Sequence, residues 1–238
     1  MSASIKWVAE LARVREVSLL GTADLGYWRD RLSAEGFVPA ESDDGRAQIL
    51  IMAADAKFMG IRFRELSFTV LINRPGGDDG ERAAYLTRAF NSSRFMAFSE
   101  RAFFATPYYH GDVRVSTARP AFVHLAQKGE GVFRAAMRGV GPGPSREPVR
   151  RGEEGWDGPV FLPELKPGKR GQGKLFFARV RGQTDAYPFL PDDDLLTIEP
   201  GSESRVLGLL RDSNFVGREW AVREDATHAK SKTYKRDV

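Results

Sequence analysis

Two segments of the sequence carry side chains that could exchange protons with a substrate. Tyr108, Tyr109 and His110 follow one another, and Glu65 lies inside the apolar run 61–72. An imidazole titrates near neutral pH, a phenol can donate a hydrogen bond to a developing oxyanion, and a carboxyl group can act as acid or base. If the two segments meet in space, they could carry out acid–base chemistry.

The run 61–72 is rich in β-branched and aromatic residues and is predicted to form a strand. Alternation along that strand predicts two faces, with Ile61, Phe63, Glu65, Ser67, Thr69 and Leu71 on one and Leu66, Phe68, Val70 and Ile72 on the other. Both faces are largely apolar, so burial should raise the pKa of Glu65 unless a cation pairs with it. Two interpretations stay open: a pocket-lining acid or base, and one half of a buried ion pair with an arginine.

The Tyr-Tyr-His segment is subject to the same alternation. If it is extended, Tyr108 and His110 share one face and Tyr109 points to the other, so at most two of the three line one pocket. Tyrosines are also common core residues whose hydroxyl finds a single partner. Packing is therefore the alternative to a functional role.

The elements that must position these residues follow from periodicity and turn residues. Leu25, Trp28 and Leu32 recur at helical spacing, which predicts a helix over 22–36 with Thr22 as its N-cap. Residues 139–158 are rich in glycine, proline and charge, which predicts a long loop, although Trp156 and the run after it should pack onto a core. Further expected elements are strands at 47–53, 113–116, 121–126, 131–137, 174–180 and 219–222, one or two helices over 81–98 with Ser92 or Ser93 as a cap, and a helix at 203–210.

Length and composition suit an ordinary soluble chain. The 238 residues are 42% apolar, which predicts one domain over residues 1–222, and the aliphatic-poor segment 223–238 is expected to be a basic, flexible tail. No apolar run approaches the ~20 residues that span a bilayer, and the first residues lack the apolar core of a signal peptide. A cytoplasmic protein without a membrane partner is expected.

Several chemistries lack their residues. The sequence contains no cysteine, which excludes disulfides, thiol catalysis and thiolate metal sites. His110, His124 and His228 are scattered, and no metal site is expected. Walker, His-Glu-x-x-His and Gly-x-Ser-x-Gly motifs are absent, and no cofactor is expected.

The charge pattern predicts a mixed, solvated surface. The net charge is +4, with 36 basic and 32 acidic residues interspersed. The tail carries Lys230, Lys232, Lys235 and Arg236, but cations without interleaved aromatic residues are a weak sign of nucleic-acid binding. A nucleic-acid partner is therefore not expected.

Two motifs carry a resemblance to a known family. The segment 101–112 resembles the active-site segment of the acetoacetate decarboxylase-like superfamily, in which Gly-Arg-Glu, two apolar residues, Gly-aromatic-Pro and two adjacent lysines occur at the same spacing. Arg101 matches the arginine, and Tyr108 and Tyr109 stand at the lysine positions. The segment from Gly60 to Glu65 is similar to the family's Gly-x-Tyr-x-Glu pattern, with Phe63 for tyrosine and one extra residue.

The resemblance implies a mainly β, α+β fold: an antiparallel β-barrel with peripheral helices over residues 20–222, forming homo-oligomers and holding a small organic acid or carbonyl compound. In that family the first lysine forms a Schiff base, and tyrosine cannot form an imine. The implied activity is a lyase, hydratase or isomerase step in which Glu65 and His110 exchange protons and Tyr108 or Tyr109 stabilises an enolate-like oxyanion. The remaining expected substrate-binding residues are Arg101, Phe63 and Tyr109.

Other hypotheses stay open beside this one. The chain could be a non-catalytic ligand-binding or sensor protein of the same fold, or a nucleic-acid-associated protein that uses its basic tail. Lys57, set beside Phe58 and Met59, could supply the family's reactive amine from a different position in the sequence. The enzyme hypothesis makes a geometric prediction: the Glu65 carboxylate should lie within about one water or small ligand of Tyr108 or His110.

Overall fold

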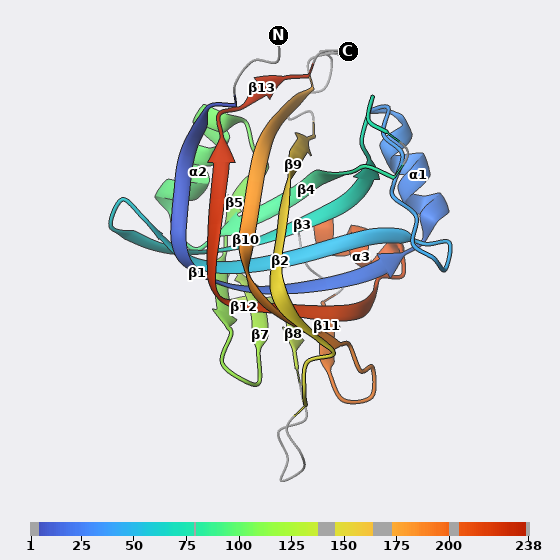
Figure 1. Ribbon diagram of the computed structural model, residues 1–238, viewed down its shortest axis with the longest axis vertical. Helices are drawn as coiled ribbons and strands as arrows, with labels where there is room; N and C mark the ends of the chain where they lie inside the picture. Colours follow the sequence, from blue (N-terminus) through green and yellow to red (C-terminus); the bar gives the residue numbers. More distant parts are fainter. Residues whose placement is uncertain (1–4, 79, 138–145, 164–172, 200–204, 237–238) are drawn as a thin grey trace.

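The structure is a computed structural model that describes residues 5–78, 80–137, 146–163, 173–199 and 205–236, and in these residues it is mainly β (Figure 1). The larger of its two sheets contains β1 (Trp7–Ala23), β2 (Ala47–Phe58), β3 (Ile61–Asn73), β4 (Arg82–Asn91), β5 (Tyr108–His110), β9 (Arg150–Leu162), β10 (Lys174–Pro188), β12 (Val216–Ser231) and β13 (Tyr234–Lys235). The smaller sheet contains β6 (Asp112–Ser116), β7 (Phe122–Gln127), β8 (Glu130–Ala136) and β11 (Leu195–Ile198).

The larger sheet is mixed. Its strand order is β12-β1-β2-β3-β4-β9-β10-β13, and β10 pairs with β12 as well as with β9. The pairings are antiparallel except where β4 meets β5 and β9. The prediction of a mainly β fold is confirmed, and the sheet departs from the predicted antiparallel pairing only where β4 meets β5 and β9 in the described residues.

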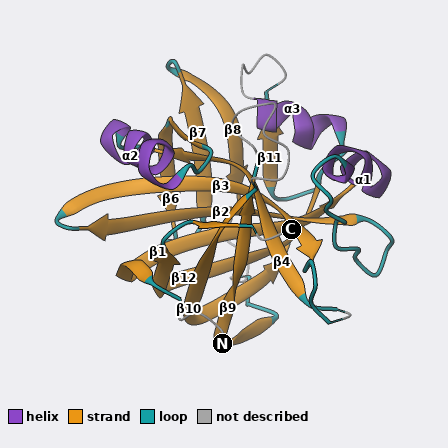
Figure 2. Cartoon of the chain, turned by 90° about the horizontal axis from the view of Figure 1, so that it is seen from above, coloured by secondary structure: helices purple, strands orange, loops and turns teal. Residues whose placement is uncertain are grey.

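The three helices of the described residues lie at the margins of the sheets, with α2 (Arg94–Phe104) at one end and α1 (Leu25–Ser33) and α3 (Arg205–Asp212) at the other (Figure 2). Ser93 caps α2 as expected, since its hydroxyl accepts a hydrogen bond from the Met96 amide. The predicted cap of α1 is wrong, because Thr22 belongs to β1 and the Asp24 carboxylate accepts from the Tyr27 amide instead. None of the helices in the described part of the chain is long and apolar enough to cross a membrane.

The alternation predicted for β3 is confirmed. Leu66, Phe68, Val70 and Ile72 point into the main core, where they pack with residues of the smaller sheet such as Phe133. The odd-numbered residues from Ile61 to Leu71 line a cavity on the other face. One strand therefore separates a dry core from a pocket.

The helix prediction for 81–98 is wrong for most of that region. Residues Arg82–Asn91 form β4, and the helix spans Arg94–Phe104. β4 is buried on both faces and so shows no alternation that would reveal a strand. Its hydrogen bonds to β3 override the helix propensity of its alanines and arginines.

Two segments predicted to lack regular structure form strands. The predicted loop 139–158 contains the first part of β9, which pairs with β10 along its length, while 138–145 lie outside the described residues. The predicted flexible tail 223–238 is wrong for its first half, because β12 continues to Ser231 between β1 and β10. Main-chain hydrogen bonds on both sides hold this strand in place of the aliphatic residues it lacks.

Phe68 tests where the core lies. Its ring packs edge-on against Phe90 and Phe133, with ring centroids 6.2 and 5.5 Å away. Phe68→Ala should lower the free energy of unfolding by about 3–5 kcal/mol, because it opens a cavity between the sheets. Phe103→Ala, at a side chain that is 75% exposed, should change it by less than about 0.5 kcal/mol. Urea denaturation measures both, and equal losses would contradict this placement of the core.

Candidate active site

A cavity of about 620 Å³ lies against the face of β3 that turns away from the main core. Three of the residues singled out from the sequence, Phe63, Glu65 and Tyr108, line it. Most of its other walls are aliphatic or aromatic. These walls include Leu11, Leu50, Met52, Phe58, Leu71, Leu86, Met96, Phe104, Trp156, Val160 and Phe176.

Glu65 and Tyr108 meet across this cavity although 43 positions separate them in the sequence. The Tyr108 hydroxyl donates to Glu65 Oε2 over 3.3 Å. The parallel pairing of β5 with β4 brings Tyr108 there, because Tyr108 lies opposite Ala89 and β4 pairs in turn with β3. The predicted approach of the two segments is confirmed.

The register of the sheet sets a row of side chains at the level of Glu65. Arg223, Glu16, Ala54, Glu65 and Asn91 are successive cross-strand partners on β12, β1, β2, β3 and β4. Paired residues share a face, so Glu16 and Glu65 lie about two strand spacings, roughly 10 Å, apart. The small Ala54 between them is buried in a cluster with Phe63 and Val14.

Glu16 is fully buried and is held as an anion by the side chains that surround its carboxylate. Its carboxylate accepts hydrogen bonds from Ser18 Oγ at 2.9 Å, from the Arg223 guanidinium, and from His228 Nε2 at 2.7 Å. Burial acts to raise the pKa of Glu16, but the His228 hydrogen bond and the charges of His228 and Arg223 outweigh it and hold the pKa below its usual value. The hydrogen bond in turn orients the His228 ring.

Glu65 has the opposite electrostatic setting. Burial raises its pKa, and the neighbouring Glu100 adds to the rise against the opposing charges of His228 and Lys230. Among the described residues no ion pair joins Glu65 to a cation, so the buried-ion-pair interpretation has no partner there. Burial also raises the pKa of Tyr108 well above its usual value, which keeps the phenol neutral and able to donate. Two carboxyl groups with pKa values moved apart are typical of an acid–base site.

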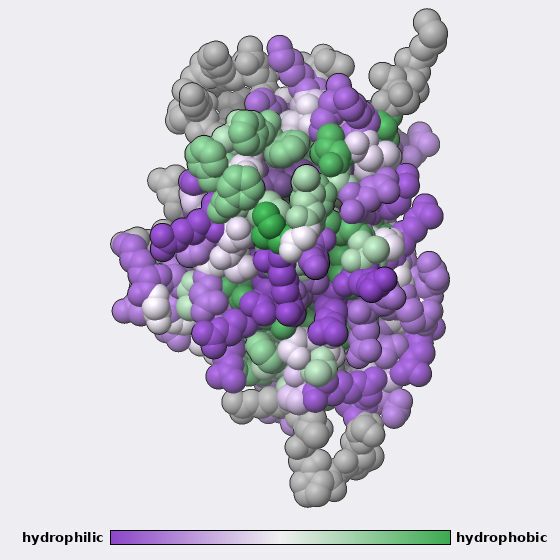
Figure 3. Space-filling view, turned by 90° about the vertical axis from the view of Figure 1, so that its left-hand side faces the viewer, coloured by the Kyte–Doolittle hydropathy of each residue, from purple (hydrophilic) through white to green (hydrophobic). Residues whose placement is uncertain are grey.

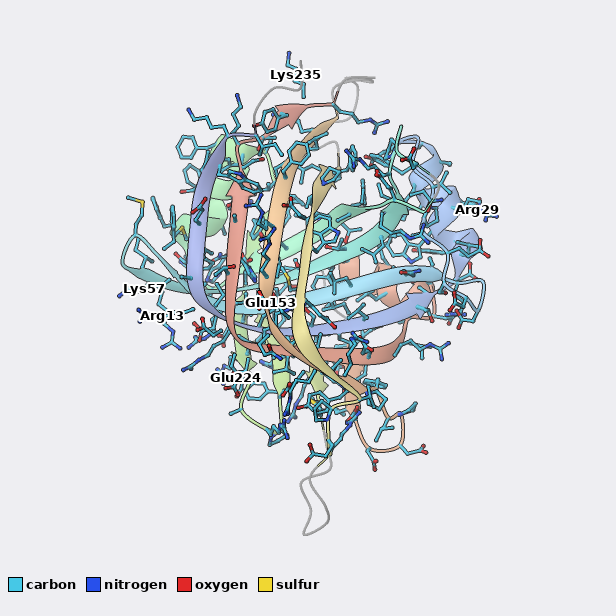
Figure 4. The ribbon with its side chains drawn as sticks, in the orientation of Figure 1. Arg13, Arg29, Lys57, Glu153, Glu224 and Lys235 are labelled. Carbon is cyan, nitrogen blue, oxygen red and sulfur yellow. The ribbon has the colours of Figure 1, made fainter. Side chains whose placement is uncertain are left out.

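Lys230 is the one lysine of the described chain that lines the cavity. It forms an ion pair with Glu100 and lies over the rings of Phe176, Phe104 and Tyr108, at 4.7, 4.9 and 5.6 Å from their centroids. Lys57, in contrast, is exposed near the tip of the β2–β3 hairpin and points away from the body of the protein (Figure 4). The amine in the cavity is therefore Lys230.

Three residues expected at the site do not line the cavity of the described chain. His110 is exposed, because it pairs with Asn91 where β4 ends. Tyr109 points the other way, as predicted, and packs against the main core beneath Arg88 and Arg101. Arg101 is exposed and stacks on Tyr109 rather than facing a ligand.

The residues that sequence reasoning missed are Glu16, Arg223, His228 and Lys230. A signal was present in each case: Glu16 alternates with the apolar Val17 and Leu19, and no glycine or proline follows Gly217. A stretch without these residues is compatible with a long strand. In the described residues no three His, Asp or Glu side chains gather as a metal site.

Comparison with known proteins shows which solved structures share this architecture. No protein-family model and no curated sequence matches the chain. Among solved structures, acetoacetate decarboxylase from Legionella pneumophila is similar, with a TM-score of 0.61 at 15% identity over 100% of this chain and 92% of that one. The chain has the acetoacetate decarboxylase-like fold.

Two further solved structures are similar. An acetoacetate decarboxylase-like enzyme from Sphingomonas wittichii has a TM-score of 0.58 at 12% identity and covers 99% of this chain and 94% of its own. The enduracididine biosynthesis enzyme MppR, in complex with pyruvate, has a TM-score of 0.62 at 13% identity, with 99% and 91% covered. The likeness therefore extends over almost the whole chain and beyond the predicted 20–222.

The two carboxyl groups predict opposite pH effects on stability. The pKa of Glu65 is raised on folding, so its contribution to stability is full below about pH 4.5 and is lost as the pH rises through the folded pKa. Glu65→Gln cannot titrate, and its stability relative to the wild type should increase as the pH rises from about 4.5. Urea denaturation at a series of pH values measures this difference.

Glu16→Gln provides the control with the opposite sign. The lowered pKa of Glu16 stabilises the fold above about pH 4.5, and this stabilisation is lost as the pH falls through the folded pKa. At neutral pH, Glu16→Gln should lower the free energy of unfolding by about 3–5 kcal/mol, because Arg223 and His228 lose their counterion. This loss relative to the wild type should become smaller as the pH falls. Parallel trends in the two variants would contradict these environments.

Proposed function

We propose that the protein is an enzyme that acts on an organic acid or carbonyl compound by acid–base chemistry without a Schiff base. The observation that carries the proposal is the Tyr108–Glu65 pair in a mostly apolar cavity, where burial raises the pKa of both groups and so favours their protonated, hydrogen-bond-donating forms. Two donors that converge on one point suit a carbonyl oxygen that gains negative charge. We assign the reaction to the lyase, hydratase or isomerase class.

His228 takes the role that was predicted for His110. It lines the cavity, and the Glu16 carboxylate accepts a hydrogen bond from its Nε2, which orients the ring and leaves the other ring nitrogen to act as the base. In the proposed step His228 takes a proton from the carbon beside the carbonyl group. Glu65 and Tyr108 donate hydrogen bonds to the carbonyl oxygen, which gains negative charge. Phe63 contacts the substrate as part of the cavity wall.

We further propose that the strands of the larger sheet form a closed barrel around the cavity. β10 pairs with β9 on one side and with β12 on the other, and β12 pairs with β1, so successive pairings return to their starting strand. A closed arrangement leaves few open strand edges and shields the interior from water. The pyruvate complex of MppR supports the view that this fold can receive a small keto acid.

Deuterium exchange tests the proposal on a panel of simple ketones and 2-keto acids, so the natural substrate need not be in hand. Proton abstraction beside a carbonyl group exchanges that hydrogen in D₂O, and proton NMR follows the exchange in each compound. Glu65→Gln and His228→Gln should each lower the exchange rate by roughly 10²–10⁴-fold, the usual contribution of a general acid or base. His110→Gln, outside the cavity, should leave the rate unchanged.

The binding alternative gives a different pattern. If a panel member binds but exchanges no faster than in buffer, and Glu65→Gln changes neither result, the protein is a ligand-binding or sensor protein. Equal losses in His110→Gln and His228→Gln would contradict the assignment of the histidine.

Borohydride trapping tests the absence of an imine. Treatment of the protein with borohydride and acetoacetate or pyruvate should leave its intact mass unchanged, because Tyr108 and Tyr109 cannot form an imine and Lys230 is held in an ion pair with Glu100. Mass spectrometry measures the outcome. A stable adduct on Lys230 in the wild type, absent in Lys230→Arg, would overturn the non-Schiff-base mechanism.

A further inference from the structure

The cavity is much larger than a short keto acid requires. Its volume of about 620 Å³ equals that of roughly 20 water molecules at about 30 Å³ each. Pockets of roughly 300–1,000 Å³ generally hold ligands of drug size. A ligand of three or four carbons would leave most of this volume unfilled.

The cavity-facing side chains of β3 change from apolar to polar along the strand. Along β3 the cavity-facing side chains run from Ile61 through Phe63 to Glu65 and then Ser67, so the strand changes from apolar to polar at Glu65. Ile61 lies four residues from Glu65, about 13 Å along a strand. An apolar path of this length therefore leads from the proposed reaction centre toward the hairpin end of the cavity.

This path ends in an exposed apolar rim. Met59, Ile61 and Phe95 line the cavity and are 85%, 43% and 63% exposed. They belong to the β2–β3 hairpin and to α2, and Figure 3 shows apolar side chains gathered on the face that these elements share with β1. Exposed apolar side chains that continue the wall of a cavity are typical of a ligand-binding groove.

We propose that the ligand is amphipathic: a carboxylic acid or ketone whose alkyl or aryl chain extends from Glu65 past Phe63 to the rim formed by Met59, Ile61 and Phe95. A path of about 13 Å corresponds to about ten C–C bonds at about 1.3 Å each, which fits a chain of roughly ten carbons. Lys230 and Arg223, each in an ion pair with a glutamate, also line the cavity. The inference rests on the proposed function for the position of the head.

A chain-length series tests the inference. Straight-chain carboxylates and 2-keto acids from two to fourteen carbons are titrated into the protein by calorimetry, below the concentrations at which they form micelles. Affinity should increase by up to about fourfold per methylene, the value for a fully buried CH₂, and level off at roughly ten carbons, where the chain reaches solvent. A flat series would overturn the inference.

Two phenylalanines of α2 provide a test variant and a control variant for the rim. Phe95 lines the cavity, whereas Phe103 is similarly exposed, at 75%, but does not line it. Phe95→Ser should weaken decanoate binding by roughly three- to tenfold and leave butanoate binding unchanged, because only the longer chain reaches the rim. Phe103→Ser should change neither affinity.

The remaining outcomes separate this inference from its rivals. Loss of self-association in both variants, measured by sedimentation, with unchanged decanoate affinity would identify the rim as a subunit contact and overturn the inference. Exchange activity on short keto acids together with a flat chain-length series would leave the proposed function intact and remove only the long chain. A rising series without exchange chemistry would keep the amphipathic ligand and remove the enzymatic function.

Discussion

A fully buried carboxylate at Glu16 is the constraint on which the site depends. An unpaired charge in such a position would cost several kcal/mol or more, so it is found only where the fold supplies cations. Here the fold supplies Arg223 and His228 from one neighbouring strand, β12. The pairing of β1 with β12 is thus an electrostatic requirement as well as a set of main-chain hydrogen bonds.

The same row of strands holds a second carboxyl group, whose pKa is shifted in the opposite direction. Glu65 lies two strands from Glu16 and has a phenol in place of a cation as its hydrogen-bonding partner. One carboxyl group therefore stays charged and orients a histidine, while the other favours its protonated form. This division of roles requires only that the cations lie on β12 and the tyrosine on β5.

The part of the site on β3 and β5 could be predicted from the sequence because those segments are apolar and alternate. A lone carboxylate between Phe63 and Ser67 stands out in such a strand, and Tyr108 follows a motif of recognisable spacing. The chemistry on β12 could not be predicted in the same way, since Arg223, His228 and Lys230 lie among small and polar residues that are typical of a tail. Their burial comes from pairing with β1 and β10, which is a property of the whole sheet and leaves no apolar periodicity in the local sequence. For the same reason β4, buried on both faces, resembled a helix.

The Glu16–Arg223 and Glu16–His228 contacts join residues 207 and 212 positions apart. Contacts so distant in the sequence carry a large loop-closure entropy and form slowly during folding. The consecutive strands β2, β3 and β4 are close in sequence, so we expect them to pair, and to position Glu65, before Glu16 meets its counterion. Recovery of ligand binding during refolding would then follow the meeting of β1 with β12, and would lag behind the appearance of β-structure as a whole.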